Sequence, residues 1–382
     1  MQSQNRTRIW GAGFVLVLAP WLTHCGQGVE FSPGVGAPGF GSALDDSAQT
    51  DPDGGIANDG DTGRREPAVT PPPMRPGWMQ KSQRVNVYAE GSRDLDVLFV
   101  VDNSGSMRSF QTSMSSRIEG FMDHVKDLNY HIAVTSTDPR SGAPWGDGQF
   151  RSFDRDRGAQ VLRASEVESS KQAERLLGEA IEMGTDGSAD ERGIYNTYRA
   201  IERRASQVTQ ASFFRDHAAL AVVLISDEDE CSVGHHQCRG VDPHKSRPDE
   251  LLKLVEEQFG ESKRFVFNSI IFPPGEECRG GAYRGNTYFE LSQKTNGVVG
   301  SVCAPNYAEQ LSSIGQLAKQ LVQSVRLECE PQDTNGDSRA NLEVFDSDKN
   351  PVKQEFDVRG DMVVFAEGLM EGEYLFNYTC KK

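Results

Sequence analysis

The 382-residue sequence has few basic residues for its length and no apolar run long enough to cross a bilayer. Its 40 lysines and arginines are outnumbered by 56 aspartates and glutamates, which gives a net charge of −16. Because nucleic-acid binding needs a basic surface to meet phosphate groups, this balance argues against it. The apolar stretch Ile9–Leu22 is shorter than the roughly 20 residues of a membrane-spanning helix, and Pro20 lies inside it.

The sequence also lacks the short motifs of several enzyme classes. It contains no G-x-S-x-G elbow, no P-loop and no H-E-x-x-H. The D-x-D pattern of aspartyl-phosphate enzymes fails after Asp102, because Ser104 stands at its third position. A G-x-G-x-x-G match at 34–39 follows no strand pattern, opens no helix and contains a proline, so it does not indicate dinucleotide binding. We therefore expect the chain not to be an enzyme.

The N-terminal residues have the pattern of an export signal. Arg6 and Arg8 precede the apolar stretch Ile9–Leu22, and "LTHC" ends at Cys25. That ending resembles a bacterial lipobox, although His24 stands where the pattern has a small residue. The resemblance implies a signal over residues 1–25, lipidation of Cys25 and a membrane anchor. We expect an exported outer-membrane lipoprotein of the cell envelope, facing the periplasm or the surface; a plain signal peptide is the alternative.

The remaining six cysteines form an even set, which in an exported chain predicts disulfides. Six cysteines allow 15 connectivities. Neighbourhood in the sequence favours the pairs Cys231–Cys238, Cys278–Cys303 and Cys329–Cys380.

Composition divides the rest of the chain into three parts. Residues 26–82 are rich in Gly, Pro, Asp, Ser and Ala, with few large apolar residues, and we expect a disordered tether. Residues 83–326 alternate apolar strand patterns, such as Leu95–Val101 and Ala219–Ser226, with amphipathic helix patterns. This alternation predicts a doubly wound, mostly parallel α/β domain. Residues 327–382 contain short alternating segments and predict a small all-β module, tied by Cys329–Cys380.

Acidic and hydroxyl-bearing segments follow the expected strands. They are "DNSGS" at 102–106, "GTDGSADERG" at 184–193 and "SDEDE" at 226–230. In open α/β sheets ligands bind beyond the carboxyl ends of the strands, so the three segments should meet at one edge. Carboxylate and hydroxyl oxygens without histidine or thiol favour Mg²⁺ or Mn²⁺ over zinc.

These segments resemble the metal-ion-dependent adhesion site of von Willebrand factor type A (VWA) domains. The first matches the family's D-x-S-x-S motif, and the order of strands and helices fits from about Leu95 to Val325. The resemblance implies that Ser104, Ser106 and Thr185 supply metal-binding hydroxyls, and that Asp102 and Asp227 hold the ion through water. The spacing of "TDGSAD" differs from the family's usual loop, so Asp186, Ser188 and Asp190 are alternatives to Thr185.

The resemblance further implies Mg²⁺ as cofactor, with Mn²⁺ or Ca²⁺ as alternatives, and a protein partner whose Asp or Glu carboxylate completes the metal shell. "SDEDECS" and "ELSQKTNGVVGSVC" also resemble exported bacterial members of the family. That likeness places the disulfides Cys231–Cys238 and Cys278–Cys303 in loops beside the ligand face. The expected function is adhesion or the assembly of an envelope complex. A structural scaffold with a fixed metal, whose β module binds the partner, is the alternative, and a metal-dependent hydrolase is a weaker one.

Three shorter signals have plainer interpretations. "CSVGHHQC" at 231–238 fits zinc, but export favours a disulfide loop. "DTNGD" at 333–337 begins like a calcium loop, but its glycine comes too early and position 12 is Val344, so a turn is expected. "RGD" at 359–361 is a three-residue match that also suits a hairpin turn.

Overall fold

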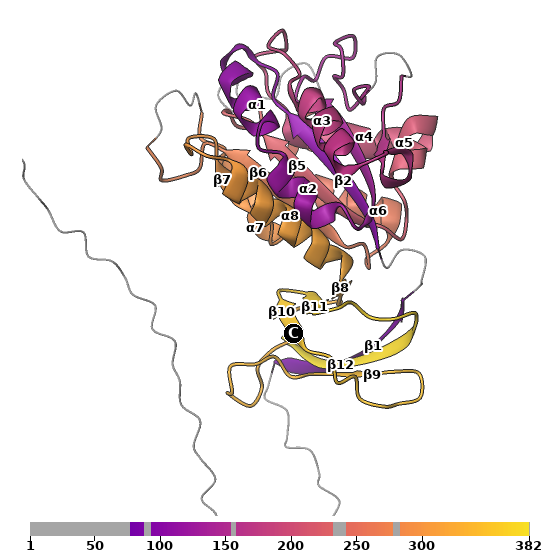
Figure 1. Cartoon of the computed structure of the whole chain (residues 1–382). Helices are drawn as coiled ribbons and strands as arrows, with labels where there is room; N and C mark the ends of the chain where they lie inside the picture. Colours follow the sequence, from indigo (N-terminus) through magenta and orange to yellow (C-terminus); the bar gives the residue numbers. More distant parts are fainter. Residues whose placement is uncertain (1–76, 88–92, 154–157, 232–241, 278–282, 382) are drawn as a thin grey trace, which may run out of the picture. The chain divides into compact units, whose positions relative to one another are not determined.

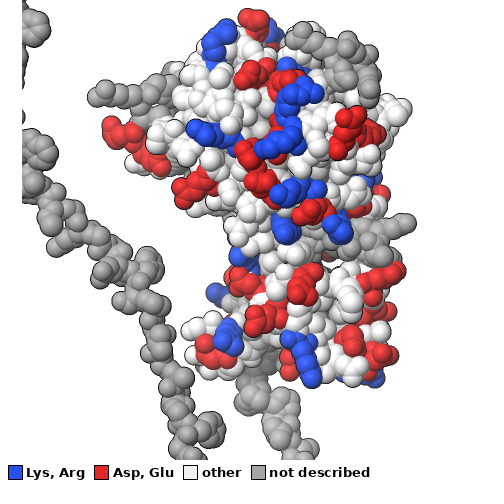
Figure 2. Space-filling model, in the orientation of Figure 1, with Lys and Arg blue, Asp and Glu red and all other residues white. Residues whose placement is uncertain are grey.

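The computed structural model describes residues 77–87, 93–153, 158–231, 242–277 and 283–381. The expected signal, Cys25 and almost all of the expected tether lie outside these ranges. Within them, no helix is long and apolar enough to cross a membrane. Figure 2 shows acidic and basic side chains intermingled on the viewed face.

A six-stranded sheet forms the centre of the α/β domain (Figure 1). Neighbouring strands are parallel except β3 and β4, which are antiparallel. The strands, in their order across the sheet, are β4 (Leu162–Arg163), β3 (Asn129–Ser136), β2 (Asp94–Val101), β5 (Ala219–Ile225), β6 (Phe265–Ile271) and β7 (Val299–Ser301).

Helices cover both faces of this sheet. Alternate side chains of a strand point to opposite faces, and on the central strands both sets are apolar. On β2, Val97 and Phe99 belong to one apolar core, and Leu98 and Val100 belong to another. The first core is completed by α1 (Arg108–Ser115), α2 (Glu119–Val125), α3 (Ser170–Ile181) and α8 (Ala308–Val322). The second is completed by α4 (Gly193–Glu202), α5 (Val208–Phe213), α6 (Pro248–Phe259) and α7 (Asn286–Lys294). The predicted doubly wound fold is therefore confirmed.

Short 3₁₀ segments adjoin several of these elements. They are η1 (Gly105–Met107), η2 (Ala164–Glu166), η3 (Arg203–Ala205) and η4 (Pro243–Ser246). The first of them matters for function, because η1 joins the end of β2 to α1 and carries Ser106.

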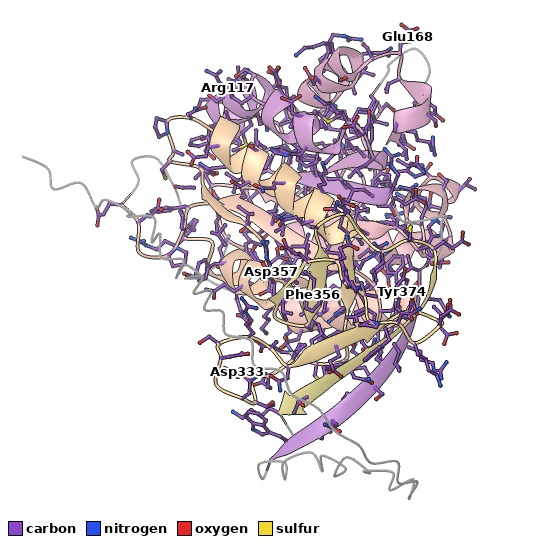
Figure 3. All side chains as sticks on the ribbon, turned by 60° about the horizontal axis from the view of Figure 1, so that its bottom comes forward. Arg117, Glu168, Asp333, Phe356, Asp357 and Tyr374 are labelled. Carbon is purple, nitrogen blue, oxygen red and sulfur yellow. A yellow bond between two sulfur atoms is a disulfide. The ribbon has the colours of Figure 1, made fainter. Side chains whose placement is uncertain are left out.

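The small β module consists of two antiparallel sheets of three strands each (Figure 3). One has the order β1 (Trp78–Val87), β12 (Gly372–Lys381), β9 (Leu342–Phe345), and the other β10 (Phe356–Arg359), β11 (Met362–Phe365), β8 (Ser324–Arg326). Phe365 and Phe376 are fully buried in its apolar core. Cys329 and Cys380 form a disulfide, as predicted.

Two strands from outside the predicted bounds of this module, 327–382, pair with its strands. Strand β1, which the sequence analysis divided between tether and α/β domain, pairs with β12 over its ten residues. Strand β8, assigned to the α/β domain, pairs with β11. Polar residues fill the middle of β1 ("QKSQR"), so its sequence gives no apolar strand signal; its ten-residue pairing with β12 holds it in place.

The two weaker signals in the module are turns. The carboxylate of Asp333 accepts hydrogen bonds from the backbone of Asn335, Gly336 and Ser338 at 2.6–3.1 Å. Gly360 has φ +60° in the hairpin between β10 and β11, the left-handed conformation that favours glycine.

Candidate metal site

The site lies where the chain changes direction across the sheet. After β2 the chain continues to β3 on one side, and after β5 it continues to β6 on the other. Strands β2 and β5 are parallel neighbours, and the Asp102 amide donates to the Ile225 carbonyl at 2.9 Å. The carboxyl ends of the two strands, followed by Asp102 and Ser226, therefore form the crevice in which doubly wound folds bind ligands.

Asp102 is fully buried and fixes the shape of the first loop. Its Oδ1 accepts from the Ser104 amide at 2.8 Å, and its Oδ2 accepts from the Ser226 hydroxyl at 2.6 Å. Burial raises the pKa of Asp102 to about 7, although these hydrogen bonds lower it. The carboxylate thus orients the backbone that presents Ser104 and Ser106.

Ser104, Ser106 and Asp227 converge at the mouth of the crevice. The hydroxyl oxygens of Ser104 and Ser106 are 3.1 Å apart, and Ser106 donates to Asp227 Oδ1 at 3.0 Å. Asp227 Oδ2 is buried and has no hydrogen-bond partner among the described residues. Burial raises the pKa of Asp227, while the Ser106 hydrogen bond lowers it. A buried carboxylate oxygen with an unused lone pair, next to two hydroxyls, fits a hard divalent cation.

The second predicted loop packs directly on the first. The Gly187 amide donates to the Asn103 carbonyl at 2.9 Å. A Cβ at Gly187 would lie 2.4 Å from Asn103 Oδ1, so only glycine permits this approach. Gln111 of α1 joins the two loops, because its Nε2 donates to the carbonyls of Asp102 at 2.7 Å and Gly184 at 2.9 Å.

Thr185 lies on this second loop, and its side chain is hydrogen-bonded to an arginine. Its hydroxyl accepts from Arg108 Nη2 at 3.1 Å. Of the alternatives, Ser188 accepts from the Asp190 amide, Asp190 pairs with Arg192, and Asp186 is exposed. The structure thus brings Ser104, Ser106 and Asp227 into one hydrogen-bonded group, and places Thr185 on the loop packed beside it.

Two other acids of "SDEDE" cap helices. Asp229 accepts from the Thr287 amide at 3.0 Å at the start of α7. Glu230 is buried, and its two oxygens accept from the amides of Ile194 at 2.8 Å and Tyr195 at 3.1 Å, in the first turn of α4. Burial raises the pKa of Glu230 to about 7, although the α4 amides lower it. The free amides at these helix N-termini favour negative charge and engage both acids, so Asp229 and Glu230 are not among the candidate metal ligands.

Sequence reasoning missed Gln111, Ser226 and Glu191. Glu191 is buried and accepts from the Thr137 hydroxyl. Burial, and then the charge of Asp102, raise the pKa of Glu191 well above its ordinary value. Ser226 was detectable, because it directly precedes Asp227 at the end of the most apolar strand. Glu191 lies in the acidic segment 184–193, although no role was predicted for it, and Gln111 has no local signal, since the fold alone brings it to the site.

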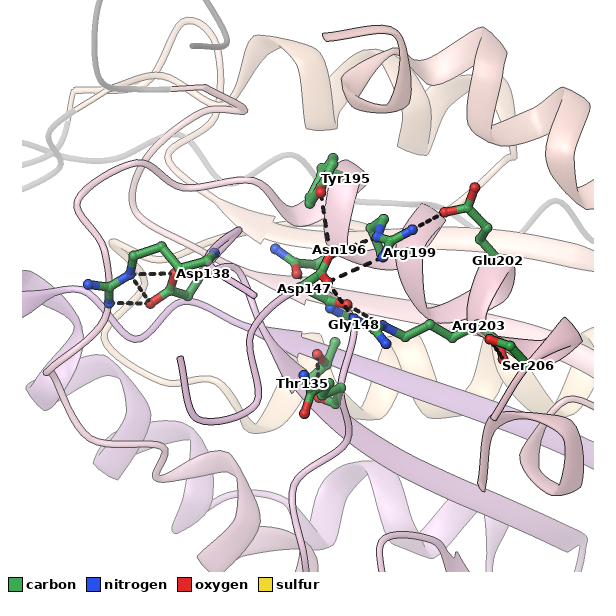
Figure 4. A network of polar contacts seen from close by, with 12 residues as sticks. Thr135, Asp138, Asp147, Gly148, Tyr195, Asn196, Arg199, Glu202, Arg203 and Ser206 are labelled. Atoms are coloured by element: carbon green, nitrogen blue, oxygen red, sulfur yellow. Dashed lines mark hydrogen bonds and ion pairs between the residues drawn. The ribbon is translucent and has the colours of Figure 1, made fainter. Parts of the chain in front are cut away.

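A charged network anchors the loop between β3 and β4 to α4 (Figure 4). At its centre Asp147 is 5% exposed and accepts from Arg199 Nε at 2.6 Å and from Arg203. Gly148 donates from its amide to Asn196 of α4 at 2.8 Å. Burial raises the pKa of Asp147, but the two guanidinium groups outweigh it and leave the pKa below its usual value.

The donor chemistry differs from that of a zinc site. Among the described residues, no three His, Cys, Asp or Glu side chains form a group that suits a metal. Cys231 and Cys303 are disulfide-bonded. Their predicted partners, Cys238 and Cys278, and the histidines of the possible zinc motif lie outside the described residues.

Neither a model of a known protein family nor a curated protein matches the chain. Similar solved structures include proximal thread matrix protein 1 from the mussel byssus, with 12% identity and a TM-score of 0.35 over 61% of this chain and 49% of that one. The pilus adhesin SpaC from Lactobacillus rhamnosus GG has 10% identity and a TM-score of 0.37, over 80% and 41%. The manganese-loaded TRAP protein of Plasmodium vivax has 13% identity and a TM-score of 0.27, over 57% and 75%.

This chain therefore spans about half of the mussel protein and two fifths of the pilus adhesin. TM-scores this low carry no argument about function. The fold is established by the strand order and the burial on both faces of the sheet.

Proposed function

We propose that the chain is a binding protein that uses a divalent metal, Mg²⁺ or Mn²⁺, to hold a carboxylate of a protein partner. The observation that carries this proposal is the convergence of Ser104, Ser106 and Asp227, with Asp227 Oδ2 buried and without a hydrogen-bond partner among the described residues. An oxygen-only donor set of this kind suits magnesium or manganese.

The chemistry of the donors explains why a partner is required. Ser104 and Ser106 are neutral, and Asp102 is engaged by the Ser104 amide and the Ser226 hydroxyl. A bound ion therefore remains short of negative charge and attracts an anionic oxygen from outside. Ser106 is exposed, so this oxygen has access from solvent. An Asp or Glu side chain on another protein supplies it.

The cellular setting follows from the N-terminal sequence. An export signal, a lipidated Cys25 and a long tether would hold the metal site at a distance from a membrane surface. We propose adhesion, or the assembly of an envelope complex, as the role of such a molecule, with binding and not catalysis as its activity.

The first test is calorimetric titration of the full chain with Mg²⁺ and Mn²⁺. A Ser104→Ala, Ser106→Ala double variant should lose binding while keeping its circular dichroism spectrum. The matched control is Ser109→Ala, Ser113→Ala, which removes two exposed hydroxyls of α1 and should bind like the parent. A folded parent that takes up neither metal, at millimolar concentration, would overturn the proposal.

One observation favours the scaffold alternative, in which the β module binds the partner. A cavity of about 1370 Å³ lies in that module, lined by polar residues such as Gln80, Asn335 and Asn377 and by Phe356. Under this alternative, Asp102→Ala leaves partner binding intact in folded protein. Under the metal proposal, partner binding is lost together with the metal.

A further inference from the structure

Arg108 is a cation placed at the edge of an otherwise acidic and hydroxyl-bearing site. It is the first residue of α1, two positions after Ser106, and its side chain is exposed. Its Nη2 donates to Thr185 Oγ1 at 3.1 Å. Among the described residues, no carboxylate forms an ion pair with it. Its charge is therefore directed at a neutral hydroxyl, in a protein whose net charge is −16.

The position of this contact is fixed by the loops on either side. On one side of Thr185, the Gly184 amide donates to Gln111 of α1. On the other side, the Gly187 amide donates to the Asn103 carbonyl of the first loop. The hydroxyl of Thr185 consequently stays close to the "DNSGS" loop, and Arg108 spans the gap between the start of α1 and the second loop. The guanidinium group thus contacts the second loop, which packs on the loop that carries Ser104 and Ser106.

We propose that Arg108 and the divalent metal compete for the oxygen of Thr185, so that Arg108 sets the metal affinity of the site. This inference rests on the proposed function. A guanidinium group and a dication cannot both approach one hydroxyl oxygen, because they repel each other. While the hydrogen bond to Thr185 holds the guanidinium group about 6 Å from the ion, this repulsion weakens metal binding roughly tenfold in a water-like medium. Without that hydrogen bond the exposed side chain moves away from the ion, and the repulsion is smaller. The effect is screened by salt, since the group is exposed.

The experiment is Mg²⁺ titration calorimetry of the full chain at low and high ionic strength. Arg108→Gln should lower the Kd of Mg²⁺ about tenfold at low salt, and by less at 1 M salt. Arg108→Lys keeps the charge and should stay near the parent. Arg117→Gln, at another exposed arginine that follows α1, is the matched control and should leave the Kd unchanged (Figure 3).

A Thr185→Ala background separates competition from simple repulsion. If Arg108 competes for the Thr185 oxygen, Arg108→Gln should give a smaller gain in this background than in the parent. An equal gain in both backgrounds, or an unchanged Kd for Arg108→Gln in the parent background, would overturn the inference while leaving the metal site established. A folded chain that binds no Mg²⁺ in any variant overturns the proposed function as well.

Discussion

Replacing Asp102 by asparagine should make the metal-free protein more stable at pH 8. Asp102 is fully buried, and burial raises its pKa from 3.8 to about 7. Between these two values the folded state holds a proton that the unfolded state has released. The free energy of unfolding therefore falls as pH rises through this window, and the full loss is reached above pH 7. Asparagine has no charge to desolvate, so it removes this loss.

The magnitude follows from the two pKa values. A difference of about three pKa units corresponds to roughly 4 kcal/mol once the pH exceeds both. The two carboxylate oxygens of Asp102 accept hydrogen bonds from the Ser104 amide at 2.8 Å and from the Ser226 hydroxyl at 2.6 Å. Asparagine has only one acceptor oxygen, so it keeps one of these two hydrogen bonds. Losing one of these hydrogen bonds costs about 1–2 kcal/mol. The net gain at pH 8 is therefore roughly 2–3 kcal/mol, and it falls close to zero at about pH 5.

Urea unfolding of the full chain in EDTA, at pH 5 and pH 8, measures this difference. Asp186→Asn, at an exposed position of the second loop, is the control and should change stability little at either pH. Excess Mg²⁺ should stabilise the parent and not Asp102→Asn. If Asp102→Asn is less stable than the parent at pH 8, or if the difference does not depend on pH, the burial argument is wrong.

Two further substitutions test the parts that support the site. Asp147→Asn removes the charge that faces Arg199 and Arg203, while asparagine still tolerates the φ of +53° at this position. This substitution should lower the free energy of unfolding by about 3 kcal/mol. The control Glu179→Gln removes an exposed ion pair and should lower it by less than about 1 kcal/mol. Because the folded-state pKa of Asp147 is lowered, the stability that its charge contributes is present above about pH 4 and is lost as the pH falls through that pKa. If urea unfolding shows the same difference in stability between Asp147→Asn and the parent at pH 2, this reasoning is contradicted. Gly187→Ala should push the second loop away from Asn103 and weaken Mg²⁺ binding about tenfold, whereas Gly142→Ala, where a Cβ meets open space, should leave the affinity unchanged. Equal affinities for these two variants in calorimetry would show that the contact between the loops does not matter for the metal.

The α/β core was predictable because its strands are buried on both faces. Val97–Val101 and Ala219–Ile225 are continuous apolar runs. A strand with one face in solvent would instead alternate apolar and polar residues, so these runs indicate strands that are covered on both faces. The rule that ligands bind at the carboxyl ends of strands then placed Asp102 and Asp227 together. The structure places them just after the adjacent strands β2 and β5, where Ser226 donates to Asp102.

The edges of the domains and the supporting residues were not predictable in this way. Strand β1 has polar residues through its middle, and its partner β12 lies nearly 300 residues away in sequence (Trp78 opposite Lys381). Gln111 reaches the site through the packing of α1, and no local pattern marks it; Glu191 lies in the acidic segment 184–193, but only the packing of the loop before α4 decides that it is buried there. Long-range pairing and side-chain packing decide such positions, and both depend on the whole fold.

The buried acids at the carboxyl ends of β2 and β5 show why we propose the metal beside Asp227. A buried carboxylate is costly unless hydrogen bonds or charges compensate it. Asp229 and Glu230 are compensated by the N-terminal amides of α7 and α4, and Asp102, after β2, by Ser104 and Ser226. Asp227 has a hydrogen bond from Ser106 on one oxygen, and its other oxygen is buried without a partner in the described part of the chain. The missing compensation is a positive charge beside Ser104 and Ser106, which the proposed divalent metal would supply.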